Sequence, residues 1–197
     1  PSLRHTVRWG LKGGQERIDD VLNEYSFVDS ADFVPDARRT RLRSSLSLAS
    51  TRLQGYAQHT WRLDSLRTLT YGVRVHQWSV NGQTLISPRV QYAFTSARNP
   101  RVAWKAAAGL YGQPPFYREL RAQAGAPQDQ QGVLNPELRA QRSYHLIVGQ
   151  ERQFQIRSRP FRFTGEAYYK YLTDVVPYDV DNVRLRYFAR NSARAYA

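Results

Sequence analysis

The sequence has no cysteine, no methionine and no long apolar run. Without cysteine, the chain can form neither disulfides nor Cys-based zinc sites. Without methionine, even at position 1, it is expected to be a segment processed or cut from a longer protein, and no signal peptide is visible. A membrane-spanning helix needs ~20 consecutive apolar residues, and the apolar stretches here are only a few residues long, as at 106–108. Helical spans are therefore excluded, whereas a transmembrane β-barrel is not, because its alternating strands have an ordinary mean hydropathy.

Negative charge is scarce, with 16 Asp and Glu against 29 Lys and Arg and a net charge of +13. Such an excess of positive charge suggests nucleic acid as a partner. The basic residues are, however, spread over the whole length with no Lys/Arg-rich tail, which suits a wall lined with cations equally well. The 4 Trp, 13 Tyr and 8 Phe supply ample surface to bury, and the length of 197 residues is that of one domain.

Alternation of apolar and polar residues with a period of two is the strongest pattern, and it indicates β-strands. In residues 67–78 one face carries Leu69, Tyr71, Val73 and Val75, and the other carries Thr70, Gly72, Arg74 and His76. The same rhythm is found at 89–94, 101–111, 161–171 and 182–188, and more weakly at 5–12, 51–61 and 143–152. The longest runs match the ~9–11 residues of a membrane-spanning strand, although a soluble antiparallel sheet with one wet face alternates in the same way.

The connections between these runs alternate in length. Those at 63–65 and 96–100 are short and contain the turn formers Asp, Asn, Ser and Pro, whereas those at 28–50 and 112–142 are long. Short turns at one end and long loops at the other are typical of an outer-membrane barrel. The hairpin dipeptide Asn81-Gly82 is an exception, since a longer loop is expected there.

Residues 16–26 are the one segment with helical spacing. Four side chains recur at i, i+3, i+4 and i+7, namely Ile18, Val21, Leu22 and Tyr25. An irregular strand that enters through Tyr25 and Phe27 fits the same residues, so both interpretations stay open. Farther along, residues 121–132 are rich in Gln, Ala and Gly, which indicates a loop tip.

Four segments carry a set of motifs in a fixed order. Residues 86–94 (ISPRVQYAF) hold Ser-Pro-Arg within a strand, and residues 103–120 (AWKAAAGLYGQPPFYREL) run from a strand into an aromatic, Pro-containing loop that ends in Glu-Leu. Residues 135–151 (NPELRAQRSYHLIVGQE) lead from Asn-Pro-x-Leu into a further strand, and 167–197 form a strand, an outer loop and a return strand. In this order and spacing they resemble the barrel of TonB-dependent outer-membrane receptors, with weaker matches at 5–12 and 50–61.

The resemblance implies an all-β fold, an antiparallel up-and-down meander of long strands that is part of a large transmembrane β-barrel. Barrels of this family close with ~22 strands around a plugged lumen, and we expect about nine or ten of them here. Residues 1–197 are then one partial barrel domain. The plug domain and the remaining strands are expected outside this chain. The implied location is the outer membrane of a Gram-negative cell.

The function that the resemblance implies is energised import of a scarce nutrient. The implied partners are outer-membrane lipid, the TonB energy-transducing system acting through the absent plug, a small nutrient ligand (siderophore, cobalamin, glycan or peptide) and a surface lipoprotein, but no nucleic acid. Neither enzyme activity nor a cofactor is expected. The alternative class is a soluble all-β basic binding module for polysaccharide or nucleic acid, with strands of ~6 residues and two apolar faces packed as a sandwich.

The residues show no constellation that indicates catalysis or metal binding. The four histidines are far apart in the sequence, at His5, His59, His76 and His145. No Gly-rich phosphate loop leads from a strand into a helix. The pairs Asp19-Asp20 and Asp179-x-Asp181 belong to no complete calcium loop, so these carboxylates are expected to be solvated.

Two groups of residues are candidates for contact with a solute. The first is a set of cations on the polar faces of the strands, which a barrel directs to its lumen: Arg74, Arg89, Lys105, Arg162, Lys170, Arg184 and Arg186. They can pair with carboxylates of the plug, attract an anionic substrate, or only make the lumen polar. The second is the loop 112–142, whose aromatic and charged residues can contact a ligand or brace the loop. The predicted substrate contacts are Phe116, Tyr117, Arg118, Glu119, Arg74 and Lys105.

Overall fold

The computed structural model describes residues 4–27, 39–125, 130–181 and 184–197, and most of them lie in β-strands. The long strands are β1 (His5–Phe27), β2 (Arg39–Arg62), β3 (Arg67–Trp78), β4 (Thr84–Thr95), β5 (Val102–Gln113), β8 (Gln141–Ile156) and β9 (Arg159–Val175). The short elements are α1 (Tyr117–Leu120), β6 (Arg121–Ala124), β7 (Gln130–Leu134), β10 (Tyr178–Asp181), β11 (Arg184–Tyr187) and β12 (Ala193–Tyr196). The prediction of an all-β fold is confirmed. Within the described ranges, no helix is long and apolar enough to span a membrane.

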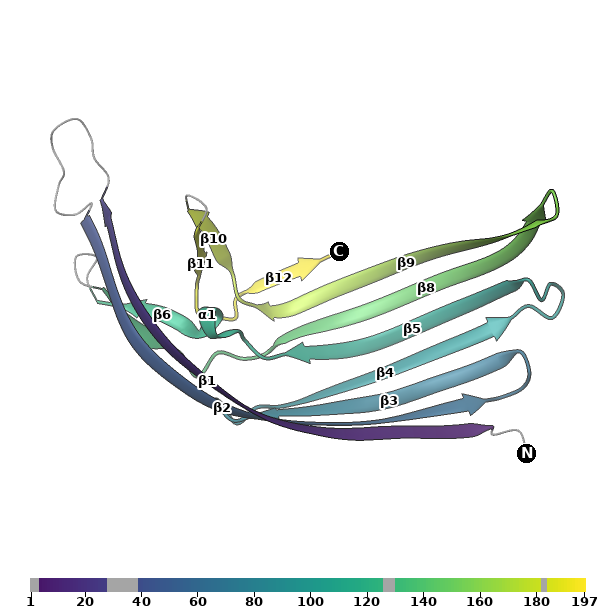
Figure 1. Ribbon diagram of the computed structural model, residues 1–197, viewed down its shortest axis with the longest axis horizontal. Coiled ribbons are helices and arrows are strands. Elements are labelled where there is room, and N and C mark those ends of the chain that lie inside the picture. Colours follow the sequence, from purple (N-terminus) through teal and green to yellow (C-terminus); the bar gives the residue numbers. More distant parts are fainter. Residues whose placement is uncertain (1–3, 28–38, 126–129, 182–183) are drawn as a thin grey trace.

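The strands form one ten-stranded sheet that curls into a half-barrel (Figure 1). Its wall runs β1–β2–β3–β4–β5–β8–β9–β12, and every neighbouring pair in this order is antiparallel. Among the described residues the sheet has ten strands, but β6 and β7 belong to a short loop hairpin, so the wall itself has eight strands and not the predicted nine or ten. β3, β4 and β5 have 12 residues each. One pairing departs from the antiparallel prediction, because β7 lies parallel to β2 at Leu42 and Arg43.

The helical interpretation of residues 16–26 is wrong. β1 pairs with β2 without a register shift from His5 to Phe27, so these residues are strand throughout. The helix-like spacing arises because both faces of this part of β1 carry apolar residues: Ile18 and Leu22 lie on one face, Val21 and Tyr25 on the other. The expected connection 28–50 is also shorter than predicted, since β2 begins at Arg39, and residues 28–38 lie outside the described ranges.

The expected loop 112–142 is largely folded. After β5 the chain forms α1 and then the hairpin β6–β7, and residues 126–129 at the expected loop tip lie outside the described ranges. β10 and β11 form a separate two-stranded sheet beyond β9. The strand predicted at 182–188 therefore exists in part, but it does not belong to the wall. We call the end of the wall strands that carries α1, the β6–β7 hairpin and the β10–β11 sheet the loop end; it lies on the left of Figure 1. The opposite end of the strands is the turn end.

Tight turns join the strands at the turn end. Asp64 Oδ1 accepts a hydrogen bond from the amide of Leu66 (2.8 Å) between β2 and β3, and Asn99 Oδ1 accepts one from the amide of Arg101 (3.1 Å) before β5. The β8–β9 turn consists of Arg157 and Ser158 with φ of 49° and 67°. Two left-handed residues in succession are what a type I′ hairpin requires, although neither is the usual Asn or Gly.

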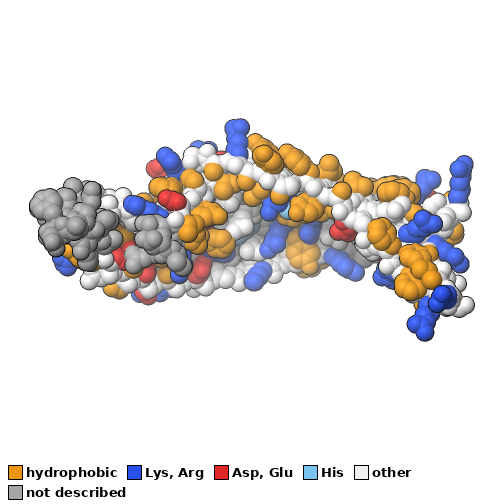
Figure 2. Space-filling model, turned by 90° about the horizontal axis from the view of Figure 1, so that it is seen from above, with side chains coloured by type: hydrophobic (Ala, Val, Ile, Leu, Met, Phe, Trp, Pro, Cys, Tyr) orange, Lys and Arg blue, Asp and Glu red, His pale blue; other side chains and the backbone are white. Residues whose placement is uncertain are grey.

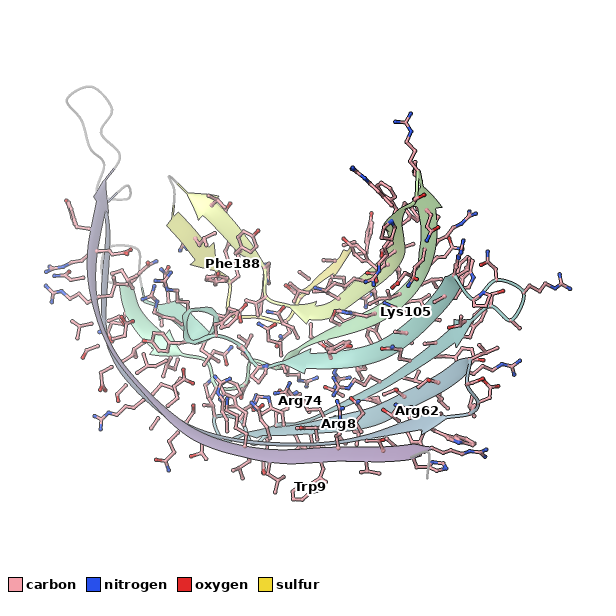
Figure 3. The ribbon with its side chains drawn as sticks, turned by 45° about the vertical axis from the view of Figure 1, so that its right-hand side comes forward. Arg8, Trp9, Arg62, Arg74, Lys105 and Phe188 are labelled. Carbon is pink, nitrogen blue, oxygen red and sulfur yellow. The ribbon has the colours of Figure 1, made fainter. Side chains whose placement is uncertain are left out.

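The two faces of the sheet differ in chemistry, as the period-two pattern predicts. Strand register places apolar side chains of neighbouring strands next to one another on the convex face, as with Val75 beside Ile86 and Ala108 beside Leu146. Figure 3 shows Trp9 pointing away from this face, while Arg8, Arg62, Arg74 and Lys105 lie on the concave side. The strand alternation predicted at 67–78, 89–94, 101–111 and 161–171 is confirmed.

The buried core lies at the loop end and not between layers of the wall. It is formed by the last residue of β3, the end of α1, the segment before β8 and the residue after β9: Trp78, Leu120, Leu138 and Val176. Four partly buried apolar residues pack against it, namely Leu48, Val80, Leu134 and Tyr187. This core fixes the folded loops against the mouth of the half-barrel.

Candidate functional site

A continuous apolar belt covers the convex face from β1 to β9. Register connects its exposed side chains from strand to strand: Val7, Trp9, Leu11, Leu53, Trp61, Tyr71, Val75, Ile86, Val90, Phe94, Trp104, Tyr144, Leu146, Val148, Phe161, Phe163 and Tyr169. Trp9 is 72% exposed and Leu11 82%. Water-soluble monomers rarely expose apolar patches larger than a few hundred Å². The belt is therefore a surface built to be covered.

Aromatic residues gather along both margins of the belt. Trp61, Phe94 and Trp104 lie near the turn end, and Tyr144 and Tyr171 lie towards the loop end with their rings 6.2 Å apart. On β9, Phe161 and Tyr171 are separated by ~34 Å along the strand, at ~3.4 Å per residue. At the ~40° strand tilt of outer-membrane barrels, this length corresponds to a height of ~25 Å, the height of the lipid-facing band of those barrels.

Polar side chains on the belt are paired with one another. His59 Nδ1 lies 2.9 Å from the hydroxyl of Tyr71, and His59 Nε2 lies 3.2 Å from His5 Nδ1. The His5 ring also packs against Trp61, with 5.7 Å between ring centroids. Two histidines far apart in sequence thus meet at the aromatic margin, where mutual hydrogen bonds reduce the cost of placing them on an apolar surface. Among the described residues, no group of three or more His, Cys, Asp or Glu could hold a metal ion.

The concave face is a trough lined with cations. Register places on it Arg8, Lys12, Arg52, Arg62, Arg74, Arg89, Lys105, Arg162 and Lys170. Two of them have carboxylate partners: Arg52 lies 3.0 Å from Glu16, and Arg162 lies 3.2 Å from Glu151. The other trough cations form no ion pair with the described part of the chain, so the trough has an excess of positive charge.

The predicted contacts Arg74 and Lys105 both lie in this trough, but they do not share a site. Arg74 is opposite Ser87 on β4, and Lys105 is opposite Ala93 on the same strand. Six residues of a strand separate these partners, or ~20 Å. Arg74 instead donates a hydrogen bond to Gln54 of β2. A small anion cannot contact both cations at once. The expectation that Arg184 and Arg186 belong to the wall is wrong, because both residues lie in β11, which is not a wall strand.

A cleft of about 1160 Å³ opens at the loop end, between the outer part of β1, the α1–β6 segment and β11. Its charged and aromatic lining comprises Asp19, Asp20, Glu24, Tyr117, Arg118, Arg121, Arg186, Tyr187, Phe188 and Arg190. The floor is fixed by Asp20, whose Oδ2 accepts hydrogen bonds from the Tyr117 hydroxyl (2.9 Å) and from Arg121 Nη1 (3.1 Å). Burial, together with the hydrogen bond to Asp20, raises the pKa of Tyr117 to about 12. The hydroxyl is therefore a donor at every physiological pH.

Aromatic rings and cations of β11 and the following residues form the opposite side of the cleft. Arg186 Nη2 donates to Gln123 Oε1 (2.6 Å), and the Arg190 guanidinium lies 5.8 Å from the centre of the Phe188 ring. Arg118 and Arg190 are exposed and form no ion pair with described residues. The cleft can therefore offer cationic donors and aromatic surface to a ligand.

The four predicted contacts from the loop have different positions. Tyr117 and Arg118 line the cleft, whereas Phe116 is 60% exposed and is absent from its lining. Glu119 is buried, and its carboxylate accepts hydrogen bonds from the Phe116 amide (2.8 Å) and from Gln141 Nε2 (2.9 Å). Glu119 thus braces the loop against β8, which is the alternative left open for this segment.

Sequence reasoning missed Asp20, Arg121, Phe188 and Arg190 as lining residues. Asp20 is 97 residues from Tyr117, and no local pattern connects them. The two-faced apolar pattern of β1 was the available signal. A strand that carries apolar residues on both faces needs cover on the inner face, and the loop hairpin provides it.

Substitution of Tyr117 with Phe is expected to loosen the α1–β6 segment. The hydrogen bond to Asp20 is charge-assisted but partly exposed, so its loss should cost ~1 kcal/mol and raise local opening about fivefold. Since the pKa of Tyr117 is raised in the folded state, the stabilisation by its hydrogen bond to Asp20 is present below pH ~10 and is lost as the pH rises towards 12. Hydrogen exchange of residues 117–124 measures it. Tyr178→Phe, which removes an exposed hydroxyl from β10, is the control and should leave that exchange unchanged.

No protein-family model matches the chain, and no curated protein matches its sequence.

Proposed function

We propose that this chain is part of the wall of a transmembrane β-barrel in an outer membrane, through which a solute is imported. The observation that carries the proposal is the segregation of the two faces. An apolar belt ~25 Å high with aromatic margins covers the convex face, and polar and cationic residues line the trough. Lipid is the environment that such a belt fits, and water or a polar occupant fits the trough.

The sheet geometry supports a barrel wall. Strands of 12 to 24 residues exceed the ~5–6 of ordinary sheets, and antiparallel pairing with short turns at one end matches outer-membrane barrels. Closure of a half-barrel requires further strands, and ~22 are expected for a barrel with a plugged lumen. β1 and β12 are then the strands that pair with the rest of the wall.

The finer proposal, TonB-dependent uptake, rests on the motifs at 86–94, 103–120, 135–151 and 167–197. In this proposal the cleft captures a nutrient, a siderophore, cobalamin, glycan or peptide, before it enters the lumen. A plug fills the trough and faces its unpaired cations with carboxylates, and the TonB system acts on the plug to open the path. A lipoprotein that closes over the loop end fits the same arrangement.

The soluble binding module explains less of the structure. A cationic trough suits a polysaccharide or nucleic acid, but the module predicts strands of ~6 residues and a second layer over the apolar face. In the described ranges, no element of the chain covers the belt from β1 to β9. Exposed to water, the belt and the open strand edges would cause aggregation.

Fractionation of cells that produce the full-length protein tests the proposal. The protein should remain in the outer-membrane fraction after alkaline extraction, and it should migrate faster on gels before boiling than after, as folded barrels do. Uptake of its nutrient should cease when the proton gradient is collapsed. Recovery of a monomeric protein from the soluble periplasmic fraction would contradict the barrel, whereas uptake that persists without the gradient would contradict only the energised mechanism.

A further inference from the structure

The turn end of the wall carries a row of arginines. They come from the β2–β3, β4–β5 and β8–β9 hairpins, and we call them the arginine rim: Arg67, Arg98, Arg101, Arg152, Arg157 and Arg159. All six are exposed. In Figure 2, blue Lys and Arg side chains gather at the right-hand end, where these turns lie, whereas most of the red Asp and Glu side chains lie towards the loop end.

Few carboxylates of the described residues neutralise the charges of the rim arginines. Arg67 lies 3.6 Å from Asp64. Within the described ranges, the other five rim arginines form no ion pair. Six like charges on neighbouring hairpins repel one another, and this cost falls when an external anion lies between them. A folded chain that keeps such a row therefore indicates an anionic partner at this end.

The position of the rim relative to the belt identifies the partner. Register places Arg152 beside Phe163 and Arg67 beside Phe94, so these cations follow directly on the convex aromatic margin. Trp and Tyr margins of membrane proteins lie at the level of the lipid headgroups. The next layer outward is the plane of the phosphates, and the guanidinium group matches a phosphate in two parallel hydrogen bonds.

We propose that the arginine rim binds the headgroups of anionic phospholipids in the leaflet at the turn end of the barrel. This inference rests on the proposed function, because the rim meets phosphates only if the belt lies in lipid. The arginine stems extend along the aromatic margin while their charged groups reach the interface. The rim then fixes the depth of the wall in the membrane.

Quenching by brominated lipids tests the proposal with the full-length protein in phosphatidylcholine vesicles. Trp61 and Trp104 lie on the convex face near the rim and report the lipid beside them. An arginine near an anionic surface contributes about fivefold in binding. Brominated phosphatidylglycerol should therefore associate about fivefold more strongly than brominated phosphatidylcholine, and the preference should weaken at high salt.

Two matched triple variants assign the effect to the rim. Arg98→Gln with Arg101→Gln and Arg159→Gln should reduce the preference towards one, while Arg41→Gln with Arg43→Gln and Arg139→Gln removes the same charge from the loop end and should preserve it. Equal quenching by the two lipids in the unmodified protein would overturn the proposal. The anionic partner of the rim would then be an acidic protein and not a lipid. Loss of the preference in both triple variants would also overturn it. If neither lipid quenches, the belt is not in lipid and the proposed function itself fails.

Discussion

Substitution of Ala106 with Arg is expected to prevent or strongly impair folding of the barrel in a membrane. Ala106 lies on the convex face of β5, beside Tyr92 of β4 and Val148 of β8, two residues from Trp104. A guanidinium on the lipid-facing side costs ~2–4 kcal/mol at the bilayer midplane and less towards the margins, so the folding equilibrium should be reduced by up to roughly 30- to 1000-fold. Urea titration of the full-length protein refolded in vesicles, followed by gel mobility without boiling, measures the change.

The adjacent residue provides the control. Ala107 has the same side chain, but its neighbours are Gln91 and Ile147 and it faces the trough. Ala107→Arg adds the same volume and charge to a polar face that already carries Lys105, so it should cost less than ~1 kcal/mol. Equal losses from the two substitutions would show that the faces do not differ in environment, and a larger loss from Ala107→Arg would reverse the assigned faces.

Substitution of Trp78 with Ala is expected to release the folded loops from the mouth of the half-barrel. Trp78 is 1% exposed and packs in the core with Leu120, Leu138 and Val176. Truncation of a buried Trp costs ~3–5 kcal/mol. Trp78 Nε1 has no hydrogen-bond partner among the described residues, so the loss is one of packing and of the contact with Arg52, whose guanidinium lies 5.5 Å from the ring centre.

The loss should appear in the loops while the wall remains intact. Hydrogen exchange of residues 117–124 and 130–140 should accelerate by at least ~100-fold, and the barrel should still migrate as a folded species. Trp9→Ala removes the same side chain from the exposed convex face and should leave loop exchange unchanged. Slow exchange of both segments in Trp78→Ala would show that the core does not hold the loops. Collapse of the whole barrel would show that wall and loops unfold together.

The wall could be predicted because each of its strands repeats one local rule. In a strand between lipid and a polar lumen, apolar and polar residues alternate along the whole length. β3, β5 and β9 can therefore be predicted from the alternation of residues such as Val73, Ala106 and Tyr169 with polar ones, without any knowledge of the neighbouring strands. β1 shows the limit of the rule. Where the folded loop lies against the inner face of β1, Ile18 and Leu22 on that face are apolar, as is Val21 on the outer face. The sequence therefore shows no alternation with a period of two in this part of the strand.

The cleft could not be predicted, because its residues meet only through the fold. Asp20 contacts Tyr117 and Arg121 after a separation of about a hundred residues, and it is placed there by the register of β1 with β2 and by the parallel contact of β2 with β7. Loop composition identified Tyr117 and Arg118 as candidates. It gave no indication that Glu119, in the same tetrapeptide, is directed into the interior.

Accessibility of single cysteines along β5 tests the central claim most directly. The chain has no cysteine, so each variant introduces one thiol into residues 1–197. In the full-length protein in membranes, we predict that a charged maleimide labels cysteines at 103, 105, 107 and 109, and that those at 104, 106, 108 and 110 react only with a lipid-soluble reagent. Uniform labelling of all eight positions, or alternation of the opposite phase, would contradict the assignment of the convex face to lipid and the concave face to the lumen.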